Sequence, residues 1–458
     1  MKKTFLLFVL FLSFFTVQAQ MPSTLSPSEK VYGLSKFWQE VNYNFIYLDK
    51  IDKKMWDSTY KSLIVKVQET KNDYEYYREM ERFCALLKDG HTNIFLPQNL
   101  QALTMTTMFG DYRLFLKNIA GKVIVEKVNL SKKDEIPIGS EIVEVNGFST
   151  QSYLNQFVKP YISSSTDYVL EDIAAYQLLK GLQSESFQIK IITPDEQKKS
   201  FTLIHKKTED LSLFPKDNVD SLLVLKWLDK DIAYLALNSF ENRKINKQFE
   251  EKLSELYKAK GLVIDLRKNG GGNTDIGTSI LQYLTNDKVL QRAKYQTREH
   301  LPSFKAWGVF LTPKDTVTND WNKRCYLYNK DLKYYTFDYY PDTISITAKR
   351  IVIPTTVLVG HSTASAAEDF LVSADNQKHF TRIGENSFGS TGQPFLFSLP
   401  GGGNARVCTK KDTYPDGREF VGVGIKPNIE VKLTLKDYIA GKDVVLEKAM
   451  SFLKDKLK

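Results

Sequence analysis

The sequence predicts an α/β fold for its C-terminal part, residues 211–458. Short apolar runs at residues 232–237 and 261–266 predict strands, and residues 246–258 and 275–284 predict amphipathic helices. Strands that alternate with helices are typical of a largely parallel sheet covered by helices. The chain has 458 residues, a length that suits two or three domains.

Residues 20–99, ahead of this part, predict a helical cap rather than a core of their own. Ser26 can cap a helix, Pro27 suits the first helical position, and Glu29 completes a capping box. Two more runs with helical periodicity follow, and Gly90 fits the position at which the last of them ends.

Residues 100–210 predict a small β domain made of short strands. The stretch IPIGSEIVEVNG, residues 136–147, resembles the strand-and-turn signature of PDZ domains. Such modules bind peptide C-termini by adding a strand to a sheet edge, so the resemblance implies a module that recruits or gates a substrate. Residues 288–348, rich in Tyr, Lys and Asp, are predicted to be an insertion in the α/β core that could cover a cleft.

The first nineteen residues have the features of a secretory signal peptide. Lys2 and Lys3 form a basic start, residues 5–15 are almost wholly apolar, and residues 17–19 supply small side chains before a cut ahead of Gln20. We therefore expect residues 1–19 to be removed and the protein to be exported, either to the periplasm or to the medium. No later stretch reaches the length of a membrane-spanning helix, so no stable membrane insertion is expected.

Composition argues against several classes of function. The formal net charge is +9, but the lysines are scattered among nearly as many acids, and no basic run is interleaved with aromatic residues. Nucleic-acid binding is therefore not indicated. The three cysteines are far apart and the five histidines are isolated, with no metal-binding spacing. We expect no metal and no cofactor, and the sequence does not indicate an oligomeric state.

Ser365 lies where a predicted buried strand turns into a predicted helix. Residues 350–358 are apolar and β-branched, and residues 366–375 have helical composition with two acids in the first turn. A serine at such a turn projects its hydroxyl from the sheet edge, and free N–H groups of the first helical turn point toward it. A nucleophilic serine needs this arrangement, although a serine here could also be only a helix N-cap.

A glycine triplet, Gly270 to Gly272, follows the second predicted strand of the α/β part. The triplet could be a tight turn, and its spacing matches no phosphate-binding motif. If the two strand–turn–helix units lie side by side, the bare backbone could instead approach a reacting carbonyl. Ser365 would then share a site with the N–H groups of Gly271 and Ala366, which could hold an oxyanion.

Four motifs occur in an order that resembles the tail-specific (C-terminal processing) and tricorn-core serine peptidases. They are VIDLRKNGGGN, STASAAEDF, IGENSFGSTGQ and GVGIKPNIEV. The resemblance covers the mature chain and implies a crotonase/ClpP-like catalytic core with an N-terminal helical cap and a PDZ-like domain. It also implies peptide-bond hydrolysis with Ser365 as nucleophile. The partners implied for this protein are protein or peptide substrates. The PDZ-like domain could bind these substrates through their C-termini.

The catalytic base differs between two branches of this family. The processing branch uses a lysine in a motif like G-E-x-x-x-G-K, and Ser390 stands at that position here, so a Ser–Lys dyad is not available. The tricorn-like branch uses a histidine from before the PDZ-like module. The stretch LKDGHT resembles that motif and implies His91 as general base, since imidazole has an unperturbed pKa near neutrality. The other reading of His91 is a surface histidine at a helix end. His361 is nearer in sequence, but a sharp turn seldom brings such a ring onto the hydroxyl.

A third residue should orient the imidazole. In the tricorn-like enzymes it is a glutamate close to a Gly-Ile/Val-x-Pro-Asp motif, and the resemblance implies Glu419, which precedes GIKPN here. The spacing does not match cleanly, so Asp89, Glu385 or a backbone carbonyl remain alternatives. Glu368 also matches the family pattern, but we expect it to be a structural carboxylate at a helix start.

The sequence therefore predicts an exported serine peptidase of the tricorn-like kind. The alternative is a catalytically inactive peptide- or ligand-binding protein on the same fold, because the missing lysine could mark lost activity. An esterase of the α/β-hydrolase type is disfavoured since no G-x-S-x-G motif is present. The position of His91 relative to Ser365 distinguishes the peptidase from the binding protein.

Overall fold

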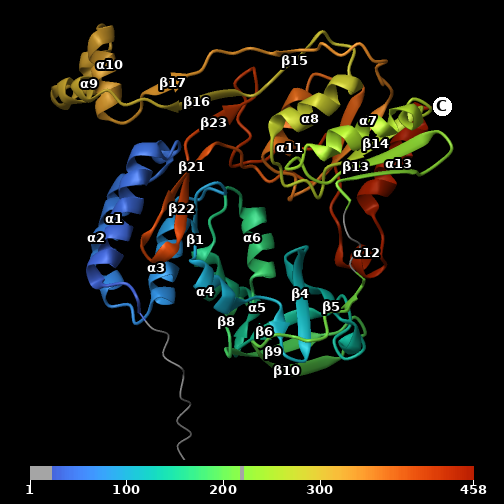
Figure 1. The fold of residues 1–458 in the computed structure, drawn as a ribbon, viewed down its shortest axis with the longest axis horizontal. Helices are drawn as coiled ribbons and strands as arrows, with labels where there is room; N and C mark the ends of the chain where they lie inside the picture. The colour runs from blue at the N-terminus through green and yellow to red at the C-terminus, as the bar shows by residue number, and fades with distance from the viewer. Residues whose placement is uncertain (1–22, 217–220) are drawn as a thin grey trace, which may run out of the picture.

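The computed structural model describes residues 23–216 and 221–458, so the predicted signal peptide lies outside the described residues. Figure 1 shows three parts: the N-terminal helices, a β domain beside them, and an α/β core that carries the C-terminus. Among the described residues, no helix combines the length and apolar character that a membrane crossing requires.

The helical cap contains three helices, as the periodicity predicted. They are α1 (Pro27–Asn44), α2 (Lys53–Gln68) and α3 (Asp73–Ala85). The predicted capping box is confirmed, because the N–H of Glu29 donates to Ser26 Oγ and the N–H of Ser26 donates to the Glu29 carboxylate. The prediction for Gly90 was wrong: α3 ends earlier, and Lys88 rather than Gly90 adopts a positive φ, of 49°.

The cap packs on a small sheet whose strands come from opposite ends of the chain. This antiparallel sheet has the order β1 (Asn93–Phe95), β22 (Asn404–Cys408) and β21 (Pro394–Ser398). Phe37 of α1 stacks on Phe397 of β21 and meets Phe83 of α3 edge-on, with ring centroids 6.5 and 5.9 Å apart. Apolar packing thus holds the segment after α3 beside the C-terminal strands.

The β domain is an eight-stranded sheet with its own hydrophobic core. Its main strands, in spatial order, are β10 (Lys198–Ile204), β9 (Ser186–Ile192), β6 (Glu141–Val145), β5 (Lys122–Asn129), β4 (Tyr112–Ile119) and β3 (Met108–Phe109); β7 (Phe148–Ser149) pairs with β6, and β11 (Leu213–Phe214) pairs with β5. The shorter elements are α4 (Gln98–Leu103), β2 (Thr104–Met105), α5 (Thr150–Tyr153) and β8 (Gly181–Leu182). The sequence reasoning missed α6 (Asp167–Tyr176), a helix that packs against β4.

The α/β core confirms the predicted fold class. Its sheet has the order β12 (Leu223–Trp227), β13 (Ile232–Leu237), β14 (Gly261–Asp265), β19 (Thr355–Val359), β20 (Phe380–Gly384) and β24 (Ile429–Glu430), parallel throughout except for β12. One face packs against α7 (Lys244–Leu256), α8 (Thr274–Leu281) and α11 (Ala366–Ser373), and the other packs against α13 (Val444–Lys456). Both faces of the central strands are therefore buried, which explains their continuous apolar sequence.

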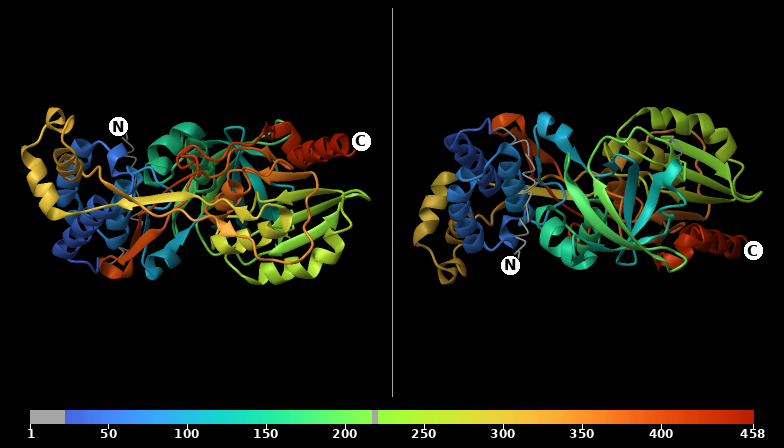
Figure 2. Two further views of the ribbon diagram at one scale, coloured as in Figure 1. Left: turned by 90° about the horizontal axis from the view of Figure 1, so that it is seen from above. Right: turned by 90° about the horizontal axis from the view of Figure 1, so that it is seen from below.

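The helical tip of the insertion lies beside the helical cap, at the end of the molecule opposite the C-terminus, and its strands run back toward the α/β core, as Figure 2 shows. It contains β15 (Val289–Leu290), β16 (Lys294–Arg298), α9 (Pro302–Trp307), α10 (Asp320–Asn329), β17 (Tyr334–Thr336) and β18 (Asp342–Thr343). A third strand, β23 (Lys411–Thr413), pairs with β16. Arg298 donates to the carbonyl of Asn42 (2.6 Å), and Lys53 pairs with Asp331 (3.0 Å). The remaining helix, α12 (Leu435–Ile439), precedes α13.

Candidate active site

Parallel pairing of β14 with β19 brings two loops together at one edge of the sheet. Asp265 is opposite Leu358, so the glycine triplet and Ser365 both follow the carboxyl ends of neighbouring strands. A Cβ atom placed on Gly271 would lie 2.7 Å from the Cβ of Ser365 and 3.0 Å from the backbone N of Ala366. Gly271 also has a φ of 102°. Only glycine therefore permits this approach, and the structure places Gly271, Ser365 and Ala366 side by side.

Ser365 has a strained backbone at the start of α11. Its φ and ψ are 53° and −121°, a region that residues with a side chain rarely adopt. Its N–H donates to the Glu368 carboxylate (3.1 Å) and lies 3.3 Å from the carbonyl of Ser390. These bonds hold the serine at a sharp strand-to-helix turn.

Glu368 connects this turn to the loop that contains Ser390. The side chain is fully buried and accepts hydrogen bonds from Ser387 Oγ (2.5 Å) and from the N–H groups of Gly389 (2.8 Å) and Ser390 (3.2 Å). Burial raises the pKa of Glu368 to about 8, although these hydrogen bonds act in the opposite direction. The expectation of a structural carboxylate agrees with these contacts.

His91 lies between α3 and β1 and contacts the same loop. Its Nδ1 is 2.7 Å from the hydroxyl oxygen of Ser390, which is fully buried. A Cβ atom on Gly90 would come within 2.8 Å of Phe388 and 3.0 Å of Ser390 Oγ, so glycine at this position allows the imidazole to approach. Ser390 thus touches His91 through its side chain and Ser365 through its carbonyl. The imidazole's hydrogen bond goes to Ser390 and not to the Ser365 hydroxyl.

The environment of His91 favours the neutral imidazole. Burial lowers the pKa of His91 to about 4, and the positive charges of Arg406 and Lys410 act in the same direction. The sequence led us to expect a near-neutral pKa for His91. The tertiary surroundings lower this pKa instead.

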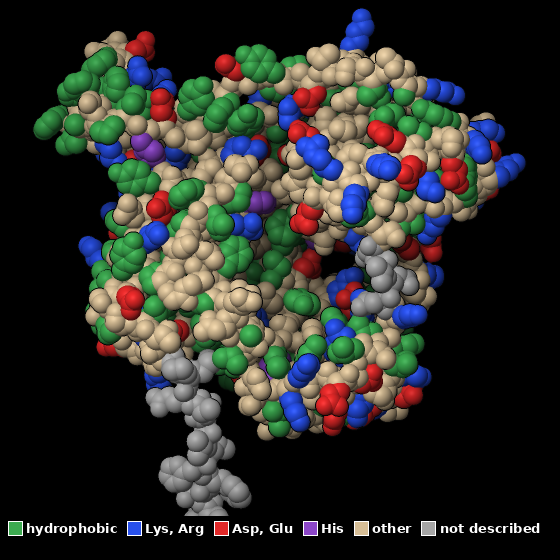
Figure 3. All heavy atoms as spheres, viewed as in Figure 1, with side chains coloured by type: hydrophobic (Ala, Val, Ile, Leu, Met, Phe, Trp, Pro, Cys, Tyr) green, Lys and Arg blue, Asp and Glu red, His purple; other side chains and the backbone are tan. Residues whose placement is uncertain are grey.

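Ser365 and His91 line one open cavity of about 580 Å³, which we call the catalytic cavity. Its other lining residues are Gly90, Gly270, Gly272, Ser362, Ala364, Phe388, Gly392, Gln393, Pro394 and Arg406. Figure 3 shows the surface hollowed between the helical cap, the β domain and the α/β core. None of the residues that line this cavity belongs to the insertion.

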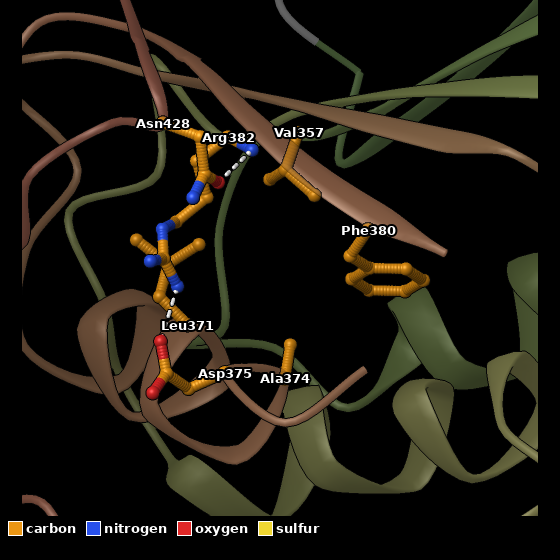
Figure 4. Close-up of a pocket in the computed structure, with 7 residues that line it drawn as sticks. All are labelled: Val357, Leu371, Ala374, Asp375, Phe380, Arg382 and Asn428. Carbon is orange, nitrogen blue, oxygen red and sulfur yellow. Dashed lines mark hydrogen bonds and ion pairs between the residues drawn. The ribbon is translucent and has the colours of Figure 1, made fainter. Parts of the chain in front are cut away.

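A second cavity lies in the α/β core but is too small for a peptide, at about 40 Å³. Figure 4 shows its polar residues, which are already engaged: Arg382 pairs with Asp375 (2.7 Å), and its N–H donates to the Asn428 side chain (2.8 Å). Its lining residues, all of them described, include no serine, cysteine or histidine.

The structure does not bring Glu419 to the imidazole. Its side chain is 47% exposed and forms ion pairs with Lys411 and Lys50. The two alternative acids are also engaged elsewhere, because Asp89 accepts from Thr92 and Ser165, and Glu385 lies 3.9 Å from His361. The structure therefore gives no support to Glu419 as the orienting residue, and the side chain that bonds the imidazole is that of Ser390.

The remaining histidines are held away from Ser365. His361 bonds Asp172 of α6 (2.6 Å) in a separate cavity of about 850 Å³ between the β domain and the core. His205, His300 and His379 bond backbone carbonyls. Of the five histidines, all within the described residues, His91 is the one that lines the catalytic cavity.

Sequence reasoning missed the two contacts that position the His91 and Ser390 loops. Ser165 accepts a hydrogen bond from the N–H of Gly90 (2.8 Å), and Tyr168 donates to the carbonyl of Ser387 (2.6 Å). Both come from the start of α6, whose sequence carries no motif. Ser390 was noticed only as a missing lysine, and nothing local signals its contact with a residue 299 positions away.

Part of the chain is similar to known peptidases. Residues 231–431 match the family model described as Peptidase family S41. The chain is 25% identical over 225 residues to a carboxy-terminal-processing protease of Bartonella bacilliformis, covering 48% of this chain and 43% of that protein. A carboxyl-terminal-processing protease of Synechocystis is 22% identical over 454 residues, covering 94% of this chain and 88% of that protein.

Solved structures share the fold at lower identity. Mature CPAF has a TM-score of 0.64 at 14% identity, over 90% of this chain and 94% of that chain. A putative peptidase from Parabacteroides merdae has a TM-score of 0.52 at 17% identity, over 94% and 97% of the two chains. These similarities support an α/β peptidase fold.

Proposed function

We propose that this chain hydrolyses peptide bonds in proteins or peptides, with Ser365 as nucleophile and His91 as general base. The observation that carries the proposal is the single cavity lined by both residues, with Ser390 in contact with each of them. Apo catalytic hydrogen bonds are often longer than those with bound substrate, so the absence of a bond between His91 and Ser365 here does not oppose the roles.

Each step can be assigned to an atom of the site. Ser365 Oγ attacks the carbonyl carbon while its proton passes to Nε2 of His91. The N–H of Ala366 stabilises the oxyanion, and the N–H of Gly271 joins it on exchanging its present hydrogen bond to Asn269 Oδ1 (3.0 Å) for one to the oxyanion. His91 then gives the proton to the departing amine, and water hydrolyses the acyl-enzyme by the same route. Ser390 accepts the Nδ1–H bond, which leaves Nε2 free to act as base.

The finer assignments of the remaining chain follow from the same proposal. The α/β core (211–458) would be of the crotonase/ClpP-like type, and the β domain (100–210) a PDZ-like module that recruits substrate C-termini. Residues 1–19 would direct export and then be removed. The inactive binding protein is not favoured, since His91 lines the cavity with Ser365 instead of pointing away from it.

Labelling with a fluorophosphonate tests the nucleophile directly. We expect the mature protein to form one adduct that mass spectrometry maps to Ser365, because a base and oxyanion donors activate that hydroxyl. Ser362, which lines the same cavity, is the internal control and should stay unmodified. A folded protein that neither labels at Ser365 nor cleaves unfolded casein would overturn the proposal.

The pH profile tests the lowered pKa of His91. The general base must be neutral, so activity is lost as pH falls through its pKa, about 4 instead of the ordinary 6.5. We therefore expect kcat/KM for peptide hydrolysis to be nearly constant from pH 7 down to about pH 5 and to decline below that. An acid limb centred at or above 6.5, in protein that remains folded by circular dichroism, would contradict this environment.

A further inference from the structure

The catalytic cavity has an uneven charge. Among its lining residues, all of them described, Arg406 is the one with a permanently charged side chain, and none is acidic. His91 adds no charge at neutral pH. A bound peptide would therefore meet a positive charge in the same cavity as Ser365.

Arg406 is held firmly but by neutral groups. It lies on β22, the central strand of the small sheet, opposite Asn93 on one side and Leu396 on the other. Its Nε donates to the Asn93 side chain (2.8 Å), and Nη2 lies 3.5 Å from the carbonyl of Gly90. The guanidinium also lies 5.5 Å from the ring centre of Phe95. No ion pair joins Arg406 to a carboxylate in the described part of the chain, and no hydrogen bond is formed by Nη1.

Asp89 acts on Arg406 electrostatically but forms no ion pair with it. Asp89 is 2% exposed, and its carboxylate is occupied by the Thr92 and Ser165 hydroxyls. Burial raises the pKa of Asp89, which opposes its ionisation. Burial also lowers the pKa of Arg406, so its unpaired cation is partly desolvated. A partly desolvated guanidinium with free donors is suited to a carboxylate, which it can bind through two parallel hydrogen bonds.

We propose that Arg406 is a carboxylate-binding subsite of the catalytic cavity and makes the enzyme prefer substrates that present a carboxylate there. The carboxylate is either the free C-terminus of the chain being cut or an Asp or Glu side chain near the scissile bond. This inference rests on the proposed peptidase function and defines its substrate class.

Binding of four labelled peptides tests the subsite independently of turnover. The peptides share one alanine-rich sequence of eight residues with an N-terminal fluorescein. One is neutral with an amidated C-terminus, one has a free C-terminus, and two are amidated with a single internal Glu or Gln. Fluorescence anisotropy measures their Kd for the mature Ser365→Ala protein, which binds but does not cleave. We expect a carboxylate-bearing peptide to bind at least about tenfold more tightly than its neutral counterpart.

The peptide with a free C-terminus and the peptide with an internal Glu identify the source of the carboxylate. Preference for the free acid alone indicates a C-terminus, and preference for Glu over Gln indicates a side chain. In Ser365→Ala/Arg406→Gln, the ratio of Kd values should fall to about one, while Arg406→Lys should keep part of it because a single ammonium lacks the guanidinium fork. Arg243→Gln removes an exposed arginine outside the cavity and should leave the ratio unchanged.

Kinetics supply a second readout on peptides that the wild type cleaves. Loss of Arg406 should raise KM for the carboxylate-bearing peptide with little change in kcat, because the contact lies away from the reacting atoms. Equal Kd values for all four peptides, or a preference that survives Arg406→Gln, would overturn the subsite. If Arg406→Gln does not fold, the Kd values of the four peptides for the Ser365→Ala protein, and their ratio in Arg406→Lys, still test the subsite. Failure of both fluorophosphonate labelling and casein cleavage would refute the peptidase proposal separately, since the binding measurement requires no catalysis.

Discussion

Replacing His91 by alanine is expected to lower kcat/KM for peptide hydrolysis by about a thousandfold or more. The reason is that no other imidazole lines the catalytic cavity, and Ser390, the nearest side chain to the imidazole, cannot act as a base. Fluorophosphonate labelling of Ser365 should slow in parallel, because the same proton transfer activates the hydroxyl. Initial rates on a quenched-fluorescence peptide measure the effect.

Two matched variants separate catalysis from positioning. Ser390→Ala keeps the imidazole but removes its Nδ1 partner, so we expect a smaller loss of about ten- to a hundredfold. His300→Ala removes a histidine that bonds only the carbonyl of Tyr43, and activity should stay within about twofold. A His91→Ala protein with near-normal activity would exclude His91 as the base.

Gly271→Ala is expected to lower kcat/KM by about a hundredfold or more. The new methyl group would lie 2.7 Å from the Cβ of Ser365 and 2.8 Å from the carbonyl of Ala364, so the nucleophile and the oxyanion donors must move apart. The positive φ of 102° adds backbone strain, so the melting temperature should fall as well. Peptide hydrolysis and thermal unfolding measure the two effects.

Gly417→Ala is the control for backbone strain alone. Gly417 also has a positive φ, of 91°, but a Cβ atom there would meet nothing within 4 Å. We expect Gly417→Ala to lose about 1 kcal/mol of stability while keeping its activity. If Gly271→Ala behaves like Gly417→Ala, the close approach to Ser365 has no catalytic importance.

The predictions that succeeded rest on local patterns. The capping box at Ser26 and Glu29 marked the start of α1. The apolar strands and amphipathic helices after residue 211 identified the α/β core, since burial on both faces of a parallel sheet requires such sequences. The motif around Ser365 placed this residue at a strand-to-helix turn, where its positive φ of 53° is observed.

The predictions that failed depended on contacts between distant segments. Glu419 was chosen from its position in a motif, but its carboxylate pairs with Lys411 and Lys50. Helix α6 was overlooked, although Ser165, just before it, bonds the loop at Gly90 and Tyr168 in its first turn bonds the loop at Ser387. The pKa of His91 was taken as ordinary, whereas burial and neighbouring cations lower it.

By itself the sequence determined the α/β fold class, the resemblance to serine peptidases, and the place of Ser365 within its strand–turn–helix unit. All of these depend on residue periodicity and on motifs that are contiguous in the chain. Only the tertiary structure decided that Ser390 holds His91 and that Arg406 stands alone in the catalytic cavity. Those relations join segments hundreds of residues apart, and they arise because apolar packing brings the N-terminal cap against the C-terminal strands.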